Sequence, residues 1–340
     1  MEKTIFIATG GTFGHIRPAI TLYESIRKEA KVYFIGAHLD KNPFFDVKLP
    51  SYSISSANFS KGFWRGLWRL SKGVFQSLHI LKAEAPSLVI GFGSFHTLPP
   101  LIAAKLLGID VILYEPNRFP GKVNRFFARF AKKNFVAFEE TKGLLKKSAQ
   151  SVELMLKASK SVNREELMQK LGLDRAKKTV LFYGGSLGAG LINNLAIEVE
   201  GTWKDEIQTV VITGQADHER VKGILKHKAV FSFYKPIEEL LLIADFAVTR
   251  AGAGTFFDLV TTSTPAIMIP YAAGIENHQL YNARYFEEVI CGGIVLEEKN
   301  VLEEFTLAFE KMLREFENHK TKIQSKGMTQ ECSIIETVLK

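Results

Sequence analysis

Twice along this chain, a short run of buried-strand residues ends in a glycine-rich turn that leads directly into a helical pattern. The first turn covers residues 9–15 (TGGTFGH), and the second covers residues 183–189 (YGGSLGA). Glycines let a backbone approach a ligand closely, and the N-terminus of the following helix attracts anions. Each turn is therefore a predicted seat for a phosphate or diphosphate. Together they predict two similar α/β halves that each hold an anionic ligand.

Strand and helix patterns alternate through most of the 340 residues, which is typical of parallel sheets covered by helices. Strands are predicted at 4–8, 31–35, 88–91, 111–114 and 134–137, and then at 179–183, 209–213, 230–233, 246–249, 266–269 and 293–295. We therefore predict an α/β fold of two doubly wound domains that face each other across a cleft. Their expected bounds are 1–158 and 159–318. A last helix, from about 319 to 340, could pack on either domain.

The formal net charge of +8 is concentrated in the first half of the chain. Residues 1–158 carry 23 basic and 11 acidic side chains, whereas the remainder carries 21 basic and 25 acidic ones. Such an excess favours a polyanionic partner, which can be a phosphorylated ligand, a nucleic acid or an anionic lipid surface. No nucleic-acid-binding motif accompanies the charge, so we expect no nucleic acid.

Two segments combine basic side chains with aromatic rings and contain no acidic residue: 47–83 and 116–138. Bases and aromatic rings on one helix suit the headgroup region of an anionic membrane. The residues expected to contact lipid are Trp64, Arg65, Trp68, Arg69, Phe126, Arg129 and Phe130. The alternative is two ordinary helices whose rings lie in the core and whose bases are solvated.

A third glycine turn, at residues 249–255 (TRAGAGT), also follows a predicted strand. Asp258 lies one turn into the next helix, where its carboxylate could accept hydrogen bonds from a ribose; the alternative is a plain capped turn. The sequence contains no DxD pair, no HExxH motif and no cluster of Cys and His, so we expect no bound metal and no cofactor. The GxGxxG fingerprint of nicotinamide-binding domains is also missing, and the two cysteines lack metal-type spacing.

The sequence begins with a buried-strand pattern rather than a signal-peptide pattern. No uninterrupted apolar run approaches the roughly 18 residues that a membrane span needs. We therefore expect any membrane association to be peripheral.

Four motifs, taken together and in this order, resemble the MurG family: residues 10–15 (GGTFGH), 184–189 (GGSLGA), 250–253 (RAGA) and 278–283 (HQLYNA). The resemblance covers nearly the whole chain. It implies the GT-B architecture and an inverting hexosyltransferase of peptidoglycan synthesis. That enzyme moves N-acetylglucosamine from UDP-N-acetylglucosamine to the 4-hydroxyl of the muramyl sugar of lipid I, a polyprenyl-diphosphate-linked muramyl peptide. The implied location is peripheral, on the cytoplasmic side of the bacterial inner membrane.

The resemblance also implies roles for individual residues. His15 would deprotonate or orient the acceptor hydroxyl. The implied donor-binding residues are Thr12, Gly14, Asn117, Arg164, Ser186, Tyr234, Arg250, Ala253, Gly254, Asp258 and Gln279. Those implied for the acceptor are Gly11, Thr12 and Glu115, and the supporting ones are Gly185, Asn193 and His278. Asp258 would bond the ribose, a backbone group of Tyr234 the uracil, and Ser186 with Arg164 the diphosphate.

The sequence also departs from the family pattern. Phe13 replaces a glycine, Leu187 replaces a glutamine, Pro116 replaces a glutamine, and Asp258 replaces a glutamate. Ser94, Phe95 and Thr97 stand in for a Gly-Tyr-x-Ser pattern, and the segment around Arg164 is barely recognisable. These changes leave three alternatives open: a related transferase that uses another lipid acceptor, a nucleotide-sugar epimerase, and a non-catalytic UDP-sugar-binding scaffold at the membrane.

Overall fold

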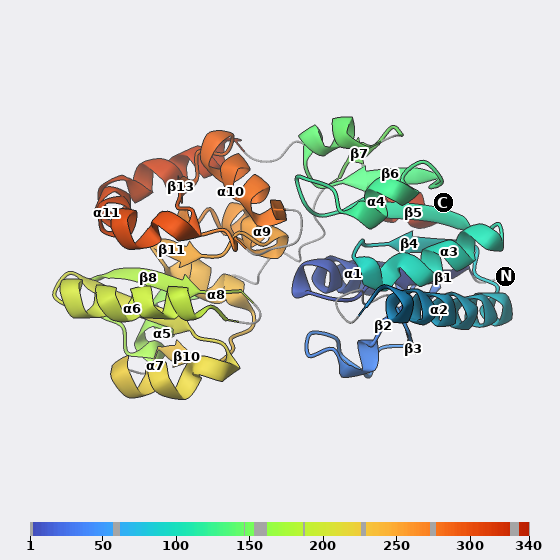
Figure 1. Cartoon of the computed structure of the whole chain (residues 1–340). Helices are drawn as coiled ribbons and strands as arrows, with labels where there is room; N and C mark the ends of the chain where they lie inside the picture. Colours follow the sequence, from blue (N-terminus) through green and yellow to red (C-terminus); the bar gives the residue numbers. More distant parts are fainter. Residues whose placement is uncertain are drawn as a thin grey trace. The chain divides into compact units, whose positions relative to one another are not determined.

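The computed structural model describes residues 3–56, 62–145, 147–152, 162–185, 188–225, 229–272, 277–326 and 333–339. The chain divides into two compact α/β units (Figure 1). Residues 1–156 and 328–340 form the first unit, and residues 157–327 form the second. The α/β class that the alternating patterns predict is confirmed.

The first unit contains a seven-stranded parallel sheet in the order β3-β2-β1-β4-β5-β6-β7. Its strands are β1 (Thr4–Ala8), β2 (Lys31–Ala37), β3 (Ser51–Ile54), β4 (Leu88–Gly91), β5 (Asp110–Glu115), β6 (Lys133–Val136) and β7 (Gln150–Ser151). The strand order reverses direction at β1, between β2 and β4. Ligands of open α/β sheets bind at the carboxyl ends of strands beside such a reversal.

Helices pack around this sheet, most of them through an apolar face. They are α1 (Phe13–Ile26), α2 (Phe63–Glu84), α3 (Leu98–Leu106), α4 (Lys122–Phe127) and α12 (Ile334–Leu339). Phe6, Val89 and Leu113 lie in the core between the strands and the helices. The short α12 is held at the start of β1, where Lys3 Nζ donates a hydrogen bond of 2.8 Å to Val338 O.

The second unit contains a six-stranded parallel sheet in the order β10-β9-β8-β11-β12-β13. Its strands are β8 (Lys178–Tyr183), β9 (Ile207–Ile212), β10 (Val230–Phe231), β11 (Phe246–Thr249), β12 (Ala266–Met268) and β13 (Gly293–Val295). Its helices are α5 (Arg164–Leu171), α6 (Gly190–Trp203), α7 (His218–Leu225), α8 (Ile237–Ile243), α9 (Ala253–Thr262), α10 (His278–Glu288) and α11 (Val301–Lys326). Here the order reverses at β8, directly before the second glycine turn.

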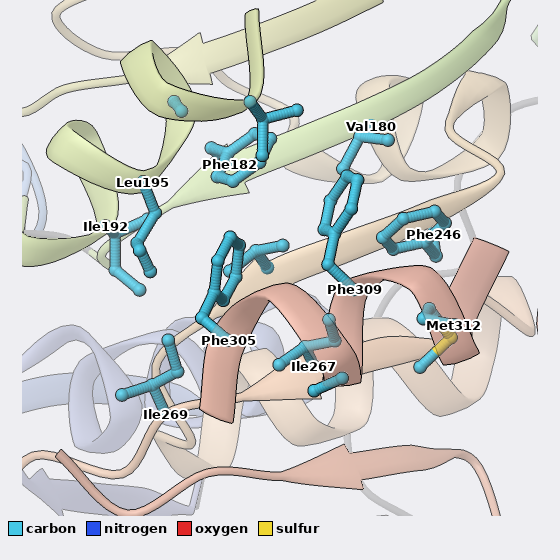
Figure 2. Close-up of a cluster of buried hydrophobic side chains, with 14 of the residues drawn as sticks. Val180, Phe182, Ile192, Leu195, Phe246, Ile267, Ile269, Phe305, Phe309 and Met312 are labelled. Atoms are coloured by element: carbon cyan, nitrogen blue, oxygen red, sulfur yellow. The ribbon is translucent and has the colours of Figure 1, made fainter. Parts of the chain in front are cut away.

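Helix α11 closes the core of the second unit. Figure 2 shows Phe305, Phe309 and Met312 of this helix pointing at side chains from the sheet, among them Val180 and Phe246. Burying a side chain of this size stabilises the fold by about 1.5–3 kcal/mol, so this face of α11 is a main source of stability.

Helix α11 differs from the helix expected at 319–340. It continues through His319, whose Nδ1 lies 2.7 Å from Cys291 O within the second unit. Only the short α12 returns to the first unit. Two strands were also not expected: β3, with four residues, and β7, with two. The strand expected at 230–233 is shortened to two residues.

Candidate active site

The first glycine turn places an open helix N-terminus at the carboxyl end of β1. Thr12 is the N-cap of α1 in an extended conformation, and Gly14 lies in the first helical turn, which has no acidic side chain. Gly11 has φ +82°, which favours glycine, and its carbonyl accepts a 2.9 Å hydrogen bond from Asn42 Nδ2. Backbone N–H groups and the helix dipole therefore favour an anion at this point.

His15 follows this turn, and its ring orientation is fixed by a neighbouring strand end. Its Nδ1 lies 2.8 Å from the carbonyl oxygen of Phe92, the residue after β4. A carbonyl oxygen can only accept, so Nδ1 carries the hydrogen and Nε2 carries the lone pair of the neutral ring. This is the orientation that a general base needs, because the basic nitrogen is then defined.

Glu115 ends β5 and organises the loop that follows it. Its Oε1 accepts hydrogen bonds from N (3.0 Å) and Nδ2 (3.1 Å) of Asn117. Its Oε2 accepts from Gly121 N (3.0 Å) and Asn124 Nδ2 (2.9 Å). Burial raises the pKa of this 2% exposed carboxyl group, while the four N–H donors oppose that shift. With both oxygens occupied, Glu115 is placed to shape the loop rather than to contact an acceptor, and Asn117 is part of the same network.

Asn124 and Gly93 connect this loop to His15, and sequence reasoning missed both residues. A Cβ built on Gly93 would lie 3.1 Å from Asn124 Nδ2 and 3.5 Å from His15 Cε1. Gly93 also has φ +82°. A glycine at this position therefore leaves the space that a side chain would fill to Asn124 and His15, which both approach the backbone there.

The second glycine turn folds tightly against the start of α6 and the end of β9. A Cβ on Gly184 would overlap Ala189 N, and one on Gly188 would overlap Thr213 O. Gly185 has φ +80° and nothing within 4 Å of a Cβ position, so its outer side is open. The turn thus has the close backbone approach that a phosphate seat requires.

Asn193 supports this turn from within. Its Nδ2 donates to Thr213 O (3.1 Å) and to Asp217 Oδ2 (2.7 Å). The side chain is fully buried, so it holds α6 against the end of β9 rather than facing a ligand. The predicted Ser186, and Leu187, lie outside the described residues.

The third glycine turn joins β11 to α9, which begins at Ala253 with Gly252 as its N-cap. Gly254 has nothing within 4 Å of a Cβ position. Helix α10 braces the turn: Gln279 Oε1 accepts hydrogen bonds from Ala251 N (3.3 Å) and Tyr271 N (3.0 Å). These two donors fix the amide orientation, so Gln279 Nε2 is the end that can donate to a ligand.

Arg250, the second residue of this turn, is almost fully buried. Its Nη2 lies 2.5 Å from Glu298 Oε1, and its Nη1 donates to Ile269 O at 3.1 Å. Glu298 Oε2 in turn accepts from Ala272 N at 3.0 Å. The guanidinium therefore ties the ends of β11 and β12 together, which is a positioning role in place of the expected donor contact.

Family models and a curated relative agree with this geometry. The family model of the glycosyltransferase family 28 N-terminal domain matches residues 5–136. The model of the glycosyltransferase family 28 C-terminal domain matches residues 179–338. Over 324 residues the chain is 33% identical to the UDP-N-acetylglucosamine–N-acetylmuramyl-(pentapeptide) pyrophosphoryl-undecaprenol N-acetylglucosamine transferase of Protochlamydia amoebophila, with 90% of this chain and 86% of that protein covered. The chain belongs to the MurG family of glycosyltransferases.

Two further members support this assignment. The transferase of the same name from Aquifex aeolicus is 28% identical over 334 residues, which cover 94% of this chain and 95% of that protein. The crystal structure of Acinetobacter baumannii MurG shares the fold with a TM-score of 0.75 at 21% identity, covering 100% of this chain and 98% of that one. The resemblance inferred from four glycine and histidine motifs, and the GT-B fold class that it implied, are confirmed.

Arg164, expected at the diphosphate of the donor site, lies near the amino ends of β8 and β11, whereas the second glycine turn follows the carboxyl end of β8. Its Nη1 donates to Leu242 O (3.1 Å), and its Nη2 lies 3.6 Å from Asp245 Oδ1. Asp245 directly precedes β11, and its Oδ2 accepts from Thr179 N near the start of β8. The glycine turn follows the other end of β8, roughly 15–20 Å away for a six-residue strand. Arg164 therefore anchors α5 on the end of α8 and does not reach the phosphate seat.

Two residues expected at the donor, Asp258 and Tyr234, and the expected supporting residue His278 are placed as follows. Asp258 lies in the second turn of α9 and is 4% exposed. Tyr234 donates from its hydroxyl to Glu239 Oε2 at 2.8 Å; burial and this hydrogen bond raise its pKa to about 12, so the phenol stays protonated. His278 is the first residue of α10, directly before Gln279. The ring of Phe231, which the sequence did not single out, lies 5.1 Å from the Tyr234 ring between centroids.

Helix α2 buries small residues and exposes large aromatic ones, which is the reverse of an ordinary amphipathic helix. Its buried face carries Gly66 and Gly73, and a Cβ on Gly73 would overlap Ser55 O. Its exposed face carries Trp64 (78% exposed) and Trp68 (65% exposed), with the ammonium group of Lys72 5.5 Å from the Trp68 ring centroid. The alternative in which these rings lie in the core is therefore wrong.

A second exposed aromatic cluster lies on and after α4. Phe126 and Phe130 are both exposed, and the Arg129 guanidinium lies 4.6 Å and 5.1 Å from their ring centroids. No helix in the described part of the chain is both long enough and apolar enough to cross a bilayer. Nor does any group of three or more His, Cys, Asp or Glu side chains suited to a metal ion occur among those residues.

Proposed function

We propose that the chain transfers N-acetylglucosamine from UDP-N-acetylglucosamine to the 4-hydroxyl of the muramyl sugar of lipid I, with inversion at the anomeric carbon. The observation that carries this proposal is the nearly full-length match to transferases named for this reaction, which cover 90% and 94% of this chain. The orientation of His15 at an anion seat supports the same chemistry independently of the names.

In the first unit, the acceptor diphosphate binds at the N-terminus of α1, against Gly11, Thr12 and Gly14. His15 Nε2 then takes the proton of the acceptor hydroxyl as its oxygen bonds the anomeric carbon. The bond from that carbon to the UDP oxygen breaks, and its electron pair leaves with the diphosphate. General-base assistance of this kind contributes about 10²–10⁴ to the rate.

In the second unit, the diphosphate of UDP binds the turn of Gly184, Gly185 and Ser186 at the start of α6. Backbone N–H groups and the helix dipole stabilise the charge that develops on the leaving group. The N-terminus of α9, at Ala253 and Gly254, and the Nε2 of Gln279 bind the transferred sugar. A backbone group of Tyr234 forms a hydrogen bond with the uracil. The Asp258 carboxylate accepts hydrogen bonds from the ribose hydroxyls.

The aromatic face of α2 and the cluster around Phe126 bind the anionic surface of the cytoplasmic membrane leaflet. Two observations support this: the exposure of Trp64 and Trp68, and the excess of positive charge in residues 1–158. Trp rings beside Lys and Arg are favoured at the headgroup level, because the rings are amphipathic and the bases attract anionic lipid. The enzyme would thus meet its lipid-linked acceptor as a peripheral membrane protein.

The test is transfer of radiolabelled sugar from UDP-N-acetylglucosamine to a short-chain lipid I analogue, with diacylglycerol as the competing acceptor. We expect labelled lipid II analogue and no labelled diacylglycerol. Transfer to diacylglycerol alone would identify a transferase with another lipid acceptor. Release of an epimerised sugar would identify an epimerase, and UDP binding without turnover on any acceptor would identify a scaffold.

A further inference from the structure

His96 lies against the first glycine turn, although it follows β4 and the turn follows β1. It belongs to the short 3-10 turn Phe95–Thr97 after β4, where its backbone N–H donates to Ser94 Oγ. A Cβ built on Gly10 would lie 2.8 Å from His96 Cβ, and one built on Gly11 would lie 3.2 Å from His96 Cδ2. The two glycines therefore let the turn rest directly on the imidazole ring.

The tautomer of this ring is fixed by β2. Nδ1 of His96 lies 3.2 Å from the carbonyl oxygen of Ala37, the last residue of that strand. Because the carbonyl can only accept, Nδ1 carries the hydrogen, and Nε2 of the neutral ring carries a lone pair. One side chain thus connects the carboxyl ends of β1, β2 and β4.

Nε2 of His96 faces the glycine turn and has no hydrogen-bond partner among the described residues; it lies 3.6 Å from the Cβ position of Gly11. Burial lowers the pKa of His96 below its ordinary value, and the bond to Ala37 opposes this shift. Within the described residues, His38 after β2 is the titratable group whose charge acts on it, and that charge lowers the pKa further. Residues 10–12 of the glycine turn and Ser94 offer the ring only backbone and hydroxyl groups, and the other titratable side chain of the turn is His15. The ring is therefore neutral at pH 7 when the turn is empty.

In the neutral ring, the lone pair of Nε2 faces the glycine turn, where the negatively charged acceptor diphosphate is expected to bind. A dianionic ligand within a few ångströms favours the protonated imidazole, because opposite charges stabilise each other. We propose that His96 takes up a proton from solvent when the acceptor diphosphate enters the first glycine turn, and that Nε2–H then donates to a diphosphate oxygen. This inference rests on the proposed function, since it requires the acceptor diphosphate to bind at the N-terminus of α1.

The proposal links acceptor affinity to pH with a definite sign. The pKa of His96 rises on binding, so affinity is greatest at low pH and falls as the pH rises through the value in the complex. A single linked proton limits the change to about tenfold in Kd per pH unit.

Calorimetry with a short-chain lipid I analogue tests this directly. The analogue is a diphosphate diester, so its phosphate oxygens do not titrate near neutral pH and any proton taken up binds the protein. Titrations between pH 6 and 8.5, in pairs of buffers with different ionisation enthalpies, give the number of protons bound on association. For the unmodified enzyme we expect a net uptake of up to about one proton.

Two substitutions distinguish the role of Nδ1 from the role of Nε2. His96→Asn places an amide N–H where Nδ1 bonds Ala37 and removes Nε2. His96→Gln places an uncharged amide where Nε2 lies. We expect both variants to lose the proton uptake, and His96→Asn to weaken acceptor binding roughly ten- to a hundredfold at pH 6.5 through loss of a charge-assisted hydrogen bond. UDP affinity stays unchanged in both, and the matched control His79→Asn, at an exposed histidine of α2, keeps the uptake.

Proton uptake equal to that of the unmodified enzyme in both His96 variants would overturn the inference, as would binding without any uptake in the unmodified enzyme. Should His96→Asn fold poorly, the result for His96→Gln decides. A protein that binds UDP but not the analogue at any pH would instead overturn the proposed function, so the two failures are distinguishable.

Discussion

Glu115→Gln is the sharpest test of how the first half-site is held together. The four hydrogen bonds to this carboxylate all come from N–H donors, two on each oxygen. A glutamine has the same shape, but its amide nitrogen must replace one oxygen. Whichever orientation it adopts, two buried donors then face another donor and lose their partner.

The expected loss of stability follows from these contacts. A hydrogen bond to a charged group contributes about 1.5–3 kcal/mol, so two lost bonds amount to roughly 3–6 kcal/mol. Removing a buried charge relieves some desolvation, and the raised pKa of Glu115 indicates that this cost is present. We expect a net loss of about 2–4 kcal/mol, a large share of the 5–15 kcal/mol typical of a domain.

Urea unfolding followed by circular dichroism measures this loss. The transition of the first unit is expected to move to lower urea. That of the second unit, identified by its shift with UDP, stays in place. The KM for the acceptor rises and the UDP affinity does not change, because Glu115 lies in the first unit. Glu140→Gln, at an exposed carboxylate of the same unit, is the matched control. An unfolding curve and an acceptor KM equal to those of the control would refute the role of Glu115 in shaping the loop.

Four further results are expected. His15→Gln lowers turnover about 10²–10⁴-fold with UDP affinity nearly intact; a parallel collapse of UDP binding would make His15 a structural residue. Gln279→Glu replaces the donating Nε2 by an acceptor, so the KM for UDP-N-acetylglucosamine rises by about tenfold or more; an unchanged KM would remove its contact with the sugar. Arg164→Ala lowers the unfolding midpoint of the second unit but leaves kcat unchanged, whereas a large fall in kcat would restore its diphosphate role. Trp64→Ser with Trp68→Ser reduces flotation with anionic vesicles, and equal flotation would argue against membrane contact at α2.

The sequence predicted the parts of the site that are encoded locally. A glycine turn between an apolar strand and a helix is a pattern of adjacent residues, so the seats at Gly11 and Gly185 and the position of His15 were recognisable. The same holds for most strands. β3 and β7 were missed because each is short, and each is stabilised mainly by pairing with β2 or β6.

The roles of buried charged residues were less predictable, because they depend on partners far away in the sequence. From the sequence alone, Arg250 was predicted to bind the ligand. The structure pairs it with Glu298, which lies 48 positions later in the sequence. The residues next to Arg164 in the sequence do not show whether it lies at the amino ends or the carboxyl ends of the strands. His96 escaped notice because its importance lies in contacts with Gly10, in the turn after β1, and with Ala37, at the end of β2.

Helix α2 illustrates what a pattern alone leaves undecided. Bases and aromatic rings at helical spacing fit both a buried and an exposed face. The choice depends on Gly73, where the close approach of Ser55 leaves room only for a hydrogen atom. A small residue on one side of the helix thus explains why the large ones lie on the other.

The return of α12 to the first unit means that the second unit is an insertion within the first. Helix α12 therefore belongs to the unit that we propose binds the acceptor, although α11, the helix before it, belongs to the unit that we propose binds the donor. A substitution in α12 therefore acts on the first unit, where Lys3 Nζ donates its hydrogen bond to Val338 O. Deleting α12 would lower the melting temperature of the first unit without touching the UDP site that we propose in the second, so the variant could bind nucleotide normally and still fail on its lipid substrate.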